Sequence, residues 1–249
     1  MSWAGRASEA EFRYRFYFLA AIYFAGFAVS GFAHRPTALW LAEKLAGSLR
    51  AAPGRAELRA LLLVAALLAA AAAGLRTWAA AYLHSQVVHD PRLHGERLVA
   101  DGPYRYLRNP LYLGGLLLAL AFGAYASPPG LLLLLLGHAV FYARLIAREE
   151  EQLARTQGAD FLEYRRRVPA LWPAWRPRLA ASGARPAWAQ AWAGEILMWL
   201  FAAALLLTAA TLEFRLLWRS VAVAFVLWFV LGRAFRRGRA VSAGGQDAQ

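Results

Sequence analysis

Six apolar stretches alternate with polar, arginine-containing segments along the chain. Their residue ranges are 16–33, 60–83, 111–126, 130–146, 191–210 and 214–231. A helix needs roughly 20 apolar residues to cross about 30 Å of hydrocarbon, so each stretch is a candidate membrane span. The third and fourth stretches are short and are joined only by "SPPG", which predicts a tight helical hairpin. The pattern predicts an all-α polytopic membrane protein with about six transmembrane helices.

The composition agrees with a membrane protein and narrows its chemistry. Hydrophobic residues make up 60% of the chain and charged residues 17%, which is more apolar material than one soluble core of this size holds. The chain has no cysteine, so disulfides, thiolate metal sites and cysteine nucleophiles are excluded. His84, His89 and His94 are too widely spaced for a two-ligand helical face, and we expect no metal.

The arginines gather in four sets that fall on one side of the membrane if there are six crossings. By the positive-inside tendency that side is cytoplasmic, together with both termini, and we expect the chain to lie in the bacterial inner membrane. The basic loop 34–59 falls on the other side, and we expect it to lie on the surface. The net charge of +13 favours membrane lipids with anionic headgroups as partners. Nucleic acid is not expected, because the arginines flank spans.

We expect four parts along the chain. Residues 1–83 hold the first two spans and their loop, and residues 84–178 form the functional core with spans three and four. Residues 179–235 hold the last two spans, whose role the sequence leaves open. Residues 236–249 form a tail that we expect to be disordered.

The segment "DGPYRYLRNPLYLGG", residues 101–115, interrupts the apolar pattern. Its Gly-Pro pair predicts a turn. Its Asn109-Pro110 pair predicts a helix start, with Asn capping N–H groups and Pro at the first helical position. Such a start suits a carboxylate or phosphate, and Arg105 and Arg108 add positive charge beside it. The alternative is a well-capped membrane helix with interfacial tyrosines and arginines.

Span four continues without a break into "RLIAREEEQLARTQG". On a helical period, one stripe carries Arg144, Arg148, Glu151 and Arg155 and looks solvated. Glu149 and Glu150 lie instead on a face that is otherwise apolar. Because an unpaired buried charge is costly, these acids need either a cationic ligand or arginines of neighbouring loops.

These two elements, in this order, resemble the isoprenylcysteine carboxyl methyltransferase family and its phospholipid methyltransferase relatives. The resemblance rests on "LVADGPYRYLRNPLYLG" and "REEEQLARTQGADFLEYRRRVPALWP", and it covers about residues 87–173. It implies a helical membrane enzyme. Such an enzyme transfers a methyl group from S-adenosylmethionine, bound in a cytoplasmic pocket, to a lipophilic acceptor from the bilayer.

Carried over by position, the resemblance implies a set of cofactor-binding residues. They are His89, Leu98, Val99, Tyr104, Asn109, Pro110, Tyr112, Glu149 and Glu150. Arg144 and Arg148 straddle the position of the substrate-side arginine, and with Glu150 they are the candidate catalytic residues. Asn109 stands where the carboxyl methyltransferases usually have His, so the acceptor stays open.

The residues themselves agree with this methyl donor. Its carboxylate suits a helix start beside an arginine, and its amine and sulfonium suit carboxylates. A carboxylate acceptor, such as a prenylcysteine, needs an arginine to orient it. An amine acceptor, such as phosphatidylethanolamine, needs a base. A non-catalytic membrane scaffold is the alternative of another class, and the sequence leaves the oligomeric state open.

Overall fold

The computed structural model describes residues 5–33, 35–48, 54–89 and 99–244, and this part of the chain is helical without strands. The elements are α1 (Glu9–Arg13), α2 (Arg15–Ala33), α3 (Thr37–Ser48), α4 (Arg55–His89), the 3-10 helix η2 (Gly102–Arg105), α5 (Pro110–Gly123), α6 (Pro128–Arg167), α7 (Trp188–Thr211) and α8 (Phe214–Gly244). Five of the six predicted apolar stretches lie within helices, and the stretch 111–126 extends three residues beyond the end of α5.

Four of the described helices are long and apolar enough to cross a membrane. They are Arg55–Leu83 in α4, Pro128–Arg167 in α6, Trp188–Thr211 in α7 and Phe214–Leu231 in α8. The other two apolar helices, in α2 and α5, are shorter. The 14 residues of α5 extend only ~21 Å at 1.5 Å per residue. The predicted all-α membrane fold is confirmed, and the count of six spans is approximate.

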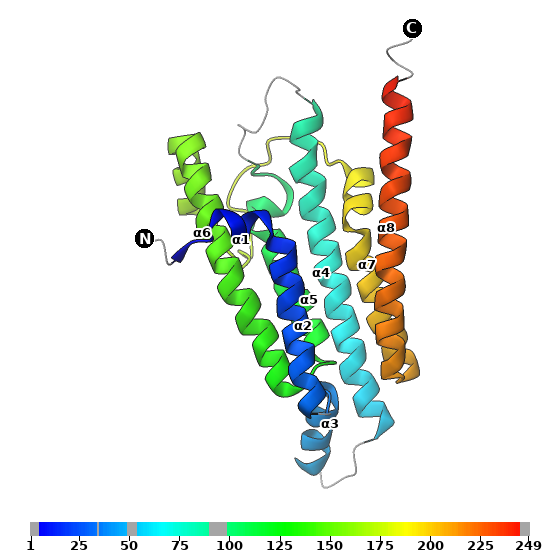
Figure 1. Cartoon of the computed structure of the whole chain (residues 1–249). Coiled ribbons are helices and arrows are strands. Elements are labelled where there is room, and N and C mark those ends of the chain that lie inside the picture. The colour runs from blue at the N-terminus through cyan, green and yellow to red at the C-terminus, as the bar shows by residue number, and fades with distance from the viewer. Residues whose placement is uncertain (1–4, 34, 49–53, 90–98, 245–249) are drawn as a thin grey trace.

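Consecutive apolar helices run in alternate directions (Figure 1). The helices α2, α5 and α7 therefore begin at the end of the bundle where α4, α6 and α8 finish. The 3-10 helix η2 and the loop after α6 also lie there, and we call this end of the bundle the motif end. The helix α3 lies at the opposite end (Figure 1).

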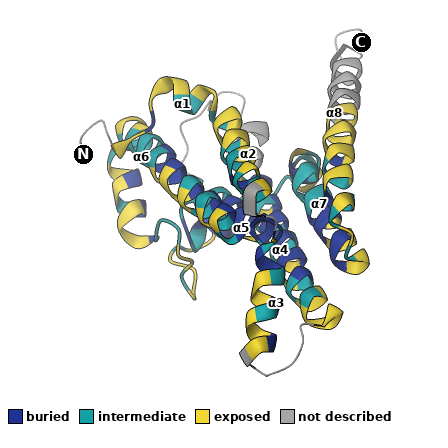
Figure 2. Ribbon diagram, turned by 60° about the horizontal axis from the view of Figure 1, so that its bottom comes forward, coloured by how far each residue is buried: buried dark blue, intermediate teal, exposed yellow. Residues whose placement is uncertain are grey.

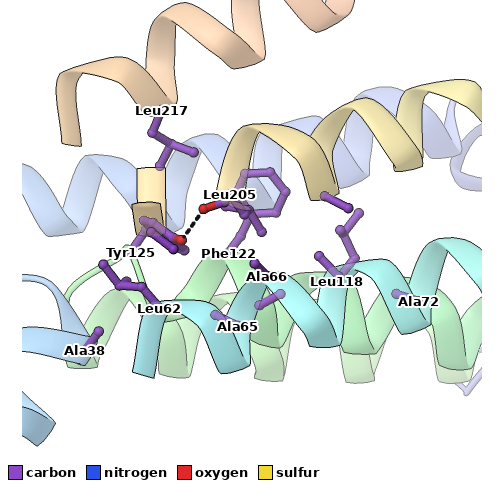
Figure 3. Packing of buried hydrophobic residues seen from close by; sticks show 14 residues of the cluster. Ala38, Leu62, Ala65, Ala66, Ala72, Leu118, Phe122, Tyr125, Leu205 and Leu217 are labelled. Atoms are coloured by element: carbon purple, nitrogen blue, oxygen red, sulfur yellow. Dashed lines mark hydrogen bonds between the residues drawn. The ribbon is translucent and has the colours of Figure 1, made fainter. Parts of the chain in front are cut away.

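The main core joins α4, α5 and α7, and α4 packs most extensively against α7. Small residues of α4, among them Ala65, Ala69 and Ala72, are at most 5% exposed there. They allow the helices to approach closely, which is how helices associate where lipid replaces water. Tyr125, which follows the end of α5, completes this core because its hydroxyl donates to the Leu205 carbonyl of α7 at 2.8 Å (Figure 3).

The basic loop 34–59 contains α3, and the first turn of α3 caps the end of α5. The amide and hydroxyl of Thr37 donate to the Ala126 carbonyl at 2.6 and 2.7 Å, and the Ala38 amide donates to the Ala124 carbonyl at 2.9 Å. These donors satisfy carbonyls that a helix end leaves without partners. The loop is thus a structural cap on the short helix α5.

The helix α8 exposes most of its side chains along its described apolar stretch, as a lipid-facing helix does (Figure 2). It continues to Gly244 and so enters residues 236–249, which the sequence assigned to a disordered tail. Arginine and alanine, which are frequent there, are good helix formers.

Candidate functional site

The start of α5 is held by the loop that follows α6. The amide of Arg108 donates to the Pro169 carbonyl at 2.8 Å, and the amide of Asn109 donates to the Ala170 carbonyl at 3.1 Å. The helix begins at Pro110, as predicted. The Asn109 side chain, however, makes no cap. Its Nδ2 instead donates to the Ala170 carbonyl at 3.2 Å. This contact with the loop after α6 holds the side chain away from the capping position. The capping prediction is therefore wrong.

Glu150 forms an ion pair with Arg108 at this turn. The Nε and Nη2 atoms of Arg108 lie 2.9 and 2.8 Å from Oε1 of Glu150, and the two side chains are 11% and 13% exposed. Arg165 reaches Oε2 of Glu150 at 3.5 Å. Arg108 also donates to the carbonyls of Arg165 and Val168. Glu150 is thus paired with Arg108 of the neighbouring loop and with Arg165 in the last turn of α6, and pairing with a loop arginine is the structural alternative that the sequence left open.

Glu149 points to a different neighbour. Its Oε1 accepts a hydrogen bond from the Tyr112 hydroxyl at 2.7 Å. The other carboxylate oxygen accepts none from a residue that the structure describes. The ring of Tyr112 lies 4.9 Å from that of Tyr142, within an apolar cluster of α1, α2, α5 and α6. Gly115 is needed there, because a Cβ on it would lie 2.2 Å from the Tyr142 hydroxyl. Glu149 therefore offers a half-buried carboxylate with one oxygen available to a cation.

Tyr104 of η2 lies at the same end and is 7% exposed. Its carbonyl accepts a hydrogen bond from the Tyr164 hydroxyl at 2.9 Å, which ties η2 to the end of α6. Burial raises the pKa of the Tyr104 phenol, and the nearby Tyr164 and Glu149 raise it further. Tyr104 therefore stays a neutral phenol, which can donate a hydrogen bond.

Four other candidates differ in how far they can be placed. Pro110 is fully buried at the start of α5, and Val99 is half-buried ahead of η2. Leu98 lies outside the described residues. His89 ends α4, and its side chain lies outside the described part.

Arg144 and Arg148 face the N-terminal segment, not Asn109 or Glu149. Arg144 forms two hydrogen bonds with Glu11, Nη2 to Oε2 at 2.8 Å and Nε to Oε1 at 3.2 Å. The Nη1 of Arg148 donates to the Ala7 carbonyl at 3.2 Å, and its guanidinium lies 5.4 Å from the Phe12 ring. The first part of the stripe predicted to be solvated is thus covered, because residues 6–12 cross it and contact Arg144 and Arg148. Its last member, Arg155, has a side chain that is 73% exposed, as predicted.

An ion pair inside the bundle was missed by the sequence reading. Arg76 of α4 donates to both carboxylate oxygens of Glu195 in α7, at 2.7 and 3.1 Å, and to the Leu111 carbonyl of α5 at 3.1 Å. Gly114 makes room for it, because a Cβ there would lie 2.4 Å from the Arg76 side chain. A single arginine near the end of an apolar helix can instead extend its side chain toward the membrane surface, and Arg76 does not do so. The apolar stretches of α4 and α7 each contain a single charged residue. Because charged residues within a membrane usually pair with one another, the sequence did contain a signal for this ion pair.

Together these contacts place the Asn-Pro turn and both acids at one end of the bundle. That end offers a Glu149 oxygen that accepts no hydrogen bond from a described residue, a neutral buried phenol and a helix start. Among the described residues, no group of three or more His, Cys, Asp or Glu side chains is placed to hold a metal ion. The arrangement suits a ligand that carries a positive charge beside hydrogen-bonding groups.

Comparison with known proteins agrees with the motifs. Residues 60–160 match the family model of phospholipid methyltransferase. The cobalt-zinc-cadmium resistance protein CzcN of Cupriavidus metallidurans is 34% identical over 99 residues, which are 39% of this chain and 42% of that protein. The chain thus matches less than half of that relative's length. No solved structure matches the chain.

Proposed function

From the phospholipid methyltransferase segment that this chain carries at residues 60–160, we propose that it is an integral membrane methyltransferase that uses S-adenosylmethionine and acts on a lipophilic acceptor. The family match confirms the resemblance that the motifs indicated. The observation that carries the proposal is the contact of Tyr112 with Glu149, 2.7 Å, beside the Arg108–Glu150 pair. These contacts join the two sequence motifs into one site.

The residues of the site fit the charges of this methyl donor. Glu149 has a carboxylate oxygen available for the amine or the sulfonium. The N–H groups at the start of α5 suit the donor's carboxylate. The phenol of Tyr104 supplies a hydrogen-bond donor close to Glu149. Val99, Leu98 and His89 belong to the same proposal as neighbours of the donor on the preceding segment.

The chain's part in the reaction is positioning. The bound donor supplies a methyl group whose carbon bonds to the acceptor as the carbon–sulfur bond breaks, which leaves a neutral thioether. Arg108 holds the start of α5 against the loop after α6, and Tyr112 fixes the rotamer of Glu149. Correct placement of two reactants can contribute about 7–11 kcal/mol in favourable cases. No group on the chain has to form a covalent bond.

Two acceptor classes remain in the proposal. A prenylcysteine-like carboxylate needs an arginine, but Arg144 and Arg148 are held by residues 7–12, so that segment would have to release one of them. An amine acceptor such as phosphatidylethanolamine needs a base, and Glu149 offers a carboxylate oxygen. The description of the matched family, phospholipid methyltransferase, favours the second class.

The motif end faces the cytoplasm in this proposal, and the membrane is the bacterial inner membrane. The helix α1, which ends at Arg13, and the start of α2 at Arg15 lie at that end (Figure 1). The positive-inside tendency supports this orientation. A cytoplasmic mouth also gives a soluble donor access to the site while a lipid enters from the side.

A lipid-extract methylation assay tests the function. The purified chain is incubated with isotopically labelled S-adenosylmethionine and a total lipid extract, and labelled lipid is identified by mass spectrometry. We expect one labelled lipid class, with the label on a carboxylate or on an amine. Tyr17→Phe, at an exposed tyrosine of α2, is the matched control for Tyr112→Phe and should keep full activity. Labelling that is absent from every lipid, with donor binding also absent, would favour the scaffold alternative.

A further inference from the structure

A small cavity lies on another side of η2, between the upper part of α4 and the loop after residue 179. Its volume is about 150 Å³. The lining residues are Trp78, Tyr82, Asp101, Gly102, Arg105, Tyr106, Ala181, Gly183 and Ala184. None of Asn109, Tyr112, Glu149 or Glu150 lines it. The cavity is therefore separate from the site proposed for methyl transfer, and it includes a loop beyond the family-matched segment.

A glycine makes this cavity possible. Gly102 has φ +57, and a Cβ on it would lie 2.3 Å from the ring of Tyr82. Any other residue would push η2 away from α4. The close approach brings the Tyr82 ring beside those of Trp78 and Tyr106, whose centroids are 6.1 Å apart. Three aromatic rings thus form the walls.

Two opposite charges complete the lining. The Asp101 carboxylate accepts hydrogen bonds from the Ser182 amide at 2.9 Å, from the Ser182 hydroxyl and from the Ala184 amide at 3.1 Å. Burial works to raise the pKa of Asp101, but these hydrogen bonds and Arg105 offset it and leave the pKa below its ordinary value. Asp101 is therefore a fixed negative charge in the cavity.

Arg105 provides the positive charge. Its Nε donates to the Leu179 carbonyl at 2.9 Å, which orients the guanidinium. Its two terminal nitrogens donate to no acceptor among the described residues. A guanidinium with two such donors suits the oxygens of a phosphate.

The chemistry of this lining selects a small zwitterion. Aromatic faces beside a carboxylate attract an alkylammonium or quaternary ammonium group. The guanidinium of Arg105 suits an anionic oxygen group at the other end of the same ligand. The cavity has about five times the ~30 Å³ that one water occupies in the liquid, which gives room for a headgroup but not for an acyl chain.

The depth of the cavity favours a lipid as the source of that zwitterion. Trp78 and Tyr82 lie in the last turns of the stretch Arg55–Leu83 that can cross the membrane. Aromatic residues at this depth mark the headgroup level of a bilayer. Trp78 is also 36% exposed at the surface of the bundle, so an acyl chain can leave along α4.

We propose that this cavity binds the zwitterionic headgroup of a phospholipid, with the amine between the aromatic rings and Asp101 and the phosphate at Arg105. The site holds a lipid beside the transfer site and does not require that lipid to be methylated. It goes beyond the proposed function and can be tested without it.

The test measures lipid binding to the purified full chain in detergent by calorimetry or native mass spectrometry. The probes are dihexanoyl phosphatidylethanolamine and dihexanoyl phosphatidic acid, which lacks the amine. We expect saturable binding of the first, and binding of the second weaker by about tenfold, the factor that corresponds to ~1.4 kcal/mol. Arg105→Gln and Tyr106→Leu should each weaken phosphatidylethanolamine binding by a similar factor.

Arg178→Gln is the matched control. Arg178 is exposed in the loop after α6, and its backbone amide, which the substitution keeps, donates to the Arg105 carbonyl. It should leave binding unchanged, and thermal unfolding should show every variant to be folded. Equal binding to native chain, Arg105→Gln and Tyr106→Leu would overturn the proposal.

A further arm separates the lipid from the methyl donor, whose amino-acid end is also a zwitterion. S-adenosylhomocysteine is added at the concentration at which it binds the chain. If it displaces phosphatidylethanolamine, the cavity belongs to the methyl donor and the proposal is overturned. The chain could also bind phosphatidylethanolamine in an Arg105-dependent way and yet bind no S-adenosylmethionine. That result would support the lipid site and contradict the proposed function.

Discussion

Two faces of α6 between residues 144 and 151 both carry charged side chains, but the side chains of each face contact a different part of the chain. Glu149 and Glu150 meet Tyr112 and Arg108, which belong to the family-matched segment. Arg144, Arg148 and Glu151 meet residues 6–12, which lie outside that segment. Charges that are close along a helix therefore need not share one site, because the helix turns by about 100° per residue and directs them to different partners.

The largest expected effect is on the acid face. Glu150→Ala leaves the Arg108 guanidinium, 11% exposed, without its carboxylate. Breaking such a buried pair from one side costs about 3–5 kcal/mol, so we expect a large fall in thermal stability. Glu163→Ala, which removes the exposed partner of Arg166 and Arg167 in the same helix, is the control and should leave Tm unchanged. Equal Tm values for the two variants would refute the buried role of Glu150.

The next effect concerns the donor. Tyr112→Phe removes only the hydroxyl that orients Glu149, and a hydrogen bond to a charged group contributes about 1.5–3 kcal/mol. We expect the affinity for S-adenosylmethionine to fall by about tenfold or more, with a smaller change in Tm than for Glu150→Ala. Unchanged affinity would show that the Tyr112–Glu149 contact is only structural.

A smaller effect is expected on the arginine face. Glu11→Gln weakens the pair with Arg144, whose side chains are 25% and 22% exposed, at a cost on the order of 1 kcal/mol near neutral pH. Donor affinity should not change. If Glu11→Gln lowered donor affinity as much as Tyr112→Phe, the distinction between the two faces would be lost.

The same pair predicts a dependence on pH. Hydrogen bonds from Arg144, followed by those from Ser8, lower the pKa of Glu11 from 4.5 to about 2. A lowered pKa in the folded state means that this stabilisation is present above the unfolded value and is lost as the pH falls toward 2. The Tm difference between native chain and Glu11→Gln should therefore shrink from pH 4.5 downward. A constant difference across that range would contradict the pairing.

The smallest effect is expected where the arginine face reaches solvent. Arg6 and Glu151 form an ion pair with side chains 45% and 35% exposed, and solvent screens such pairs. We expect Arg6→Ala to change neither Tm nor donor affinity measurably. A clear fall in either value would show that residues 5–7 do more than cover α6.

The apolar periods of the sequence predicted the helices well, because each span is a local composition signal. The stretches 60–83 and 214–231 lie inside helices that extend beyond them only in polar or basic turns. The motifs also predicted that the Asn-Pro turn and the acids share one end. Both contacts of the acids, with Arg108 and with Tyr112, bear this out.

The side-chain pairings could not be predicted in the same way, since they join residues far apart in the sequence. The Arg144 pair with Glu11 spans 133 positions and the Arg76 pair with Glu195 spans 119. The Asn109 cap was wrong for a related reason. A loop about 60 residues away competes for the same side chain, and no local rule includes that loop.

Calorimetric binding of S-adenosylmethionine to the purified chain in detergent is the decisive measurement for the site around Glu149. We predict saturable binding to a single site. Glu149→Gln should weaken this binding, and Glu11→Gln should leave it unchanged, because Glu11 of α1 contacts the other face of α6. A native, folded chain that shows no saturable binding would contradict the account, as would equal binding by all three proteins.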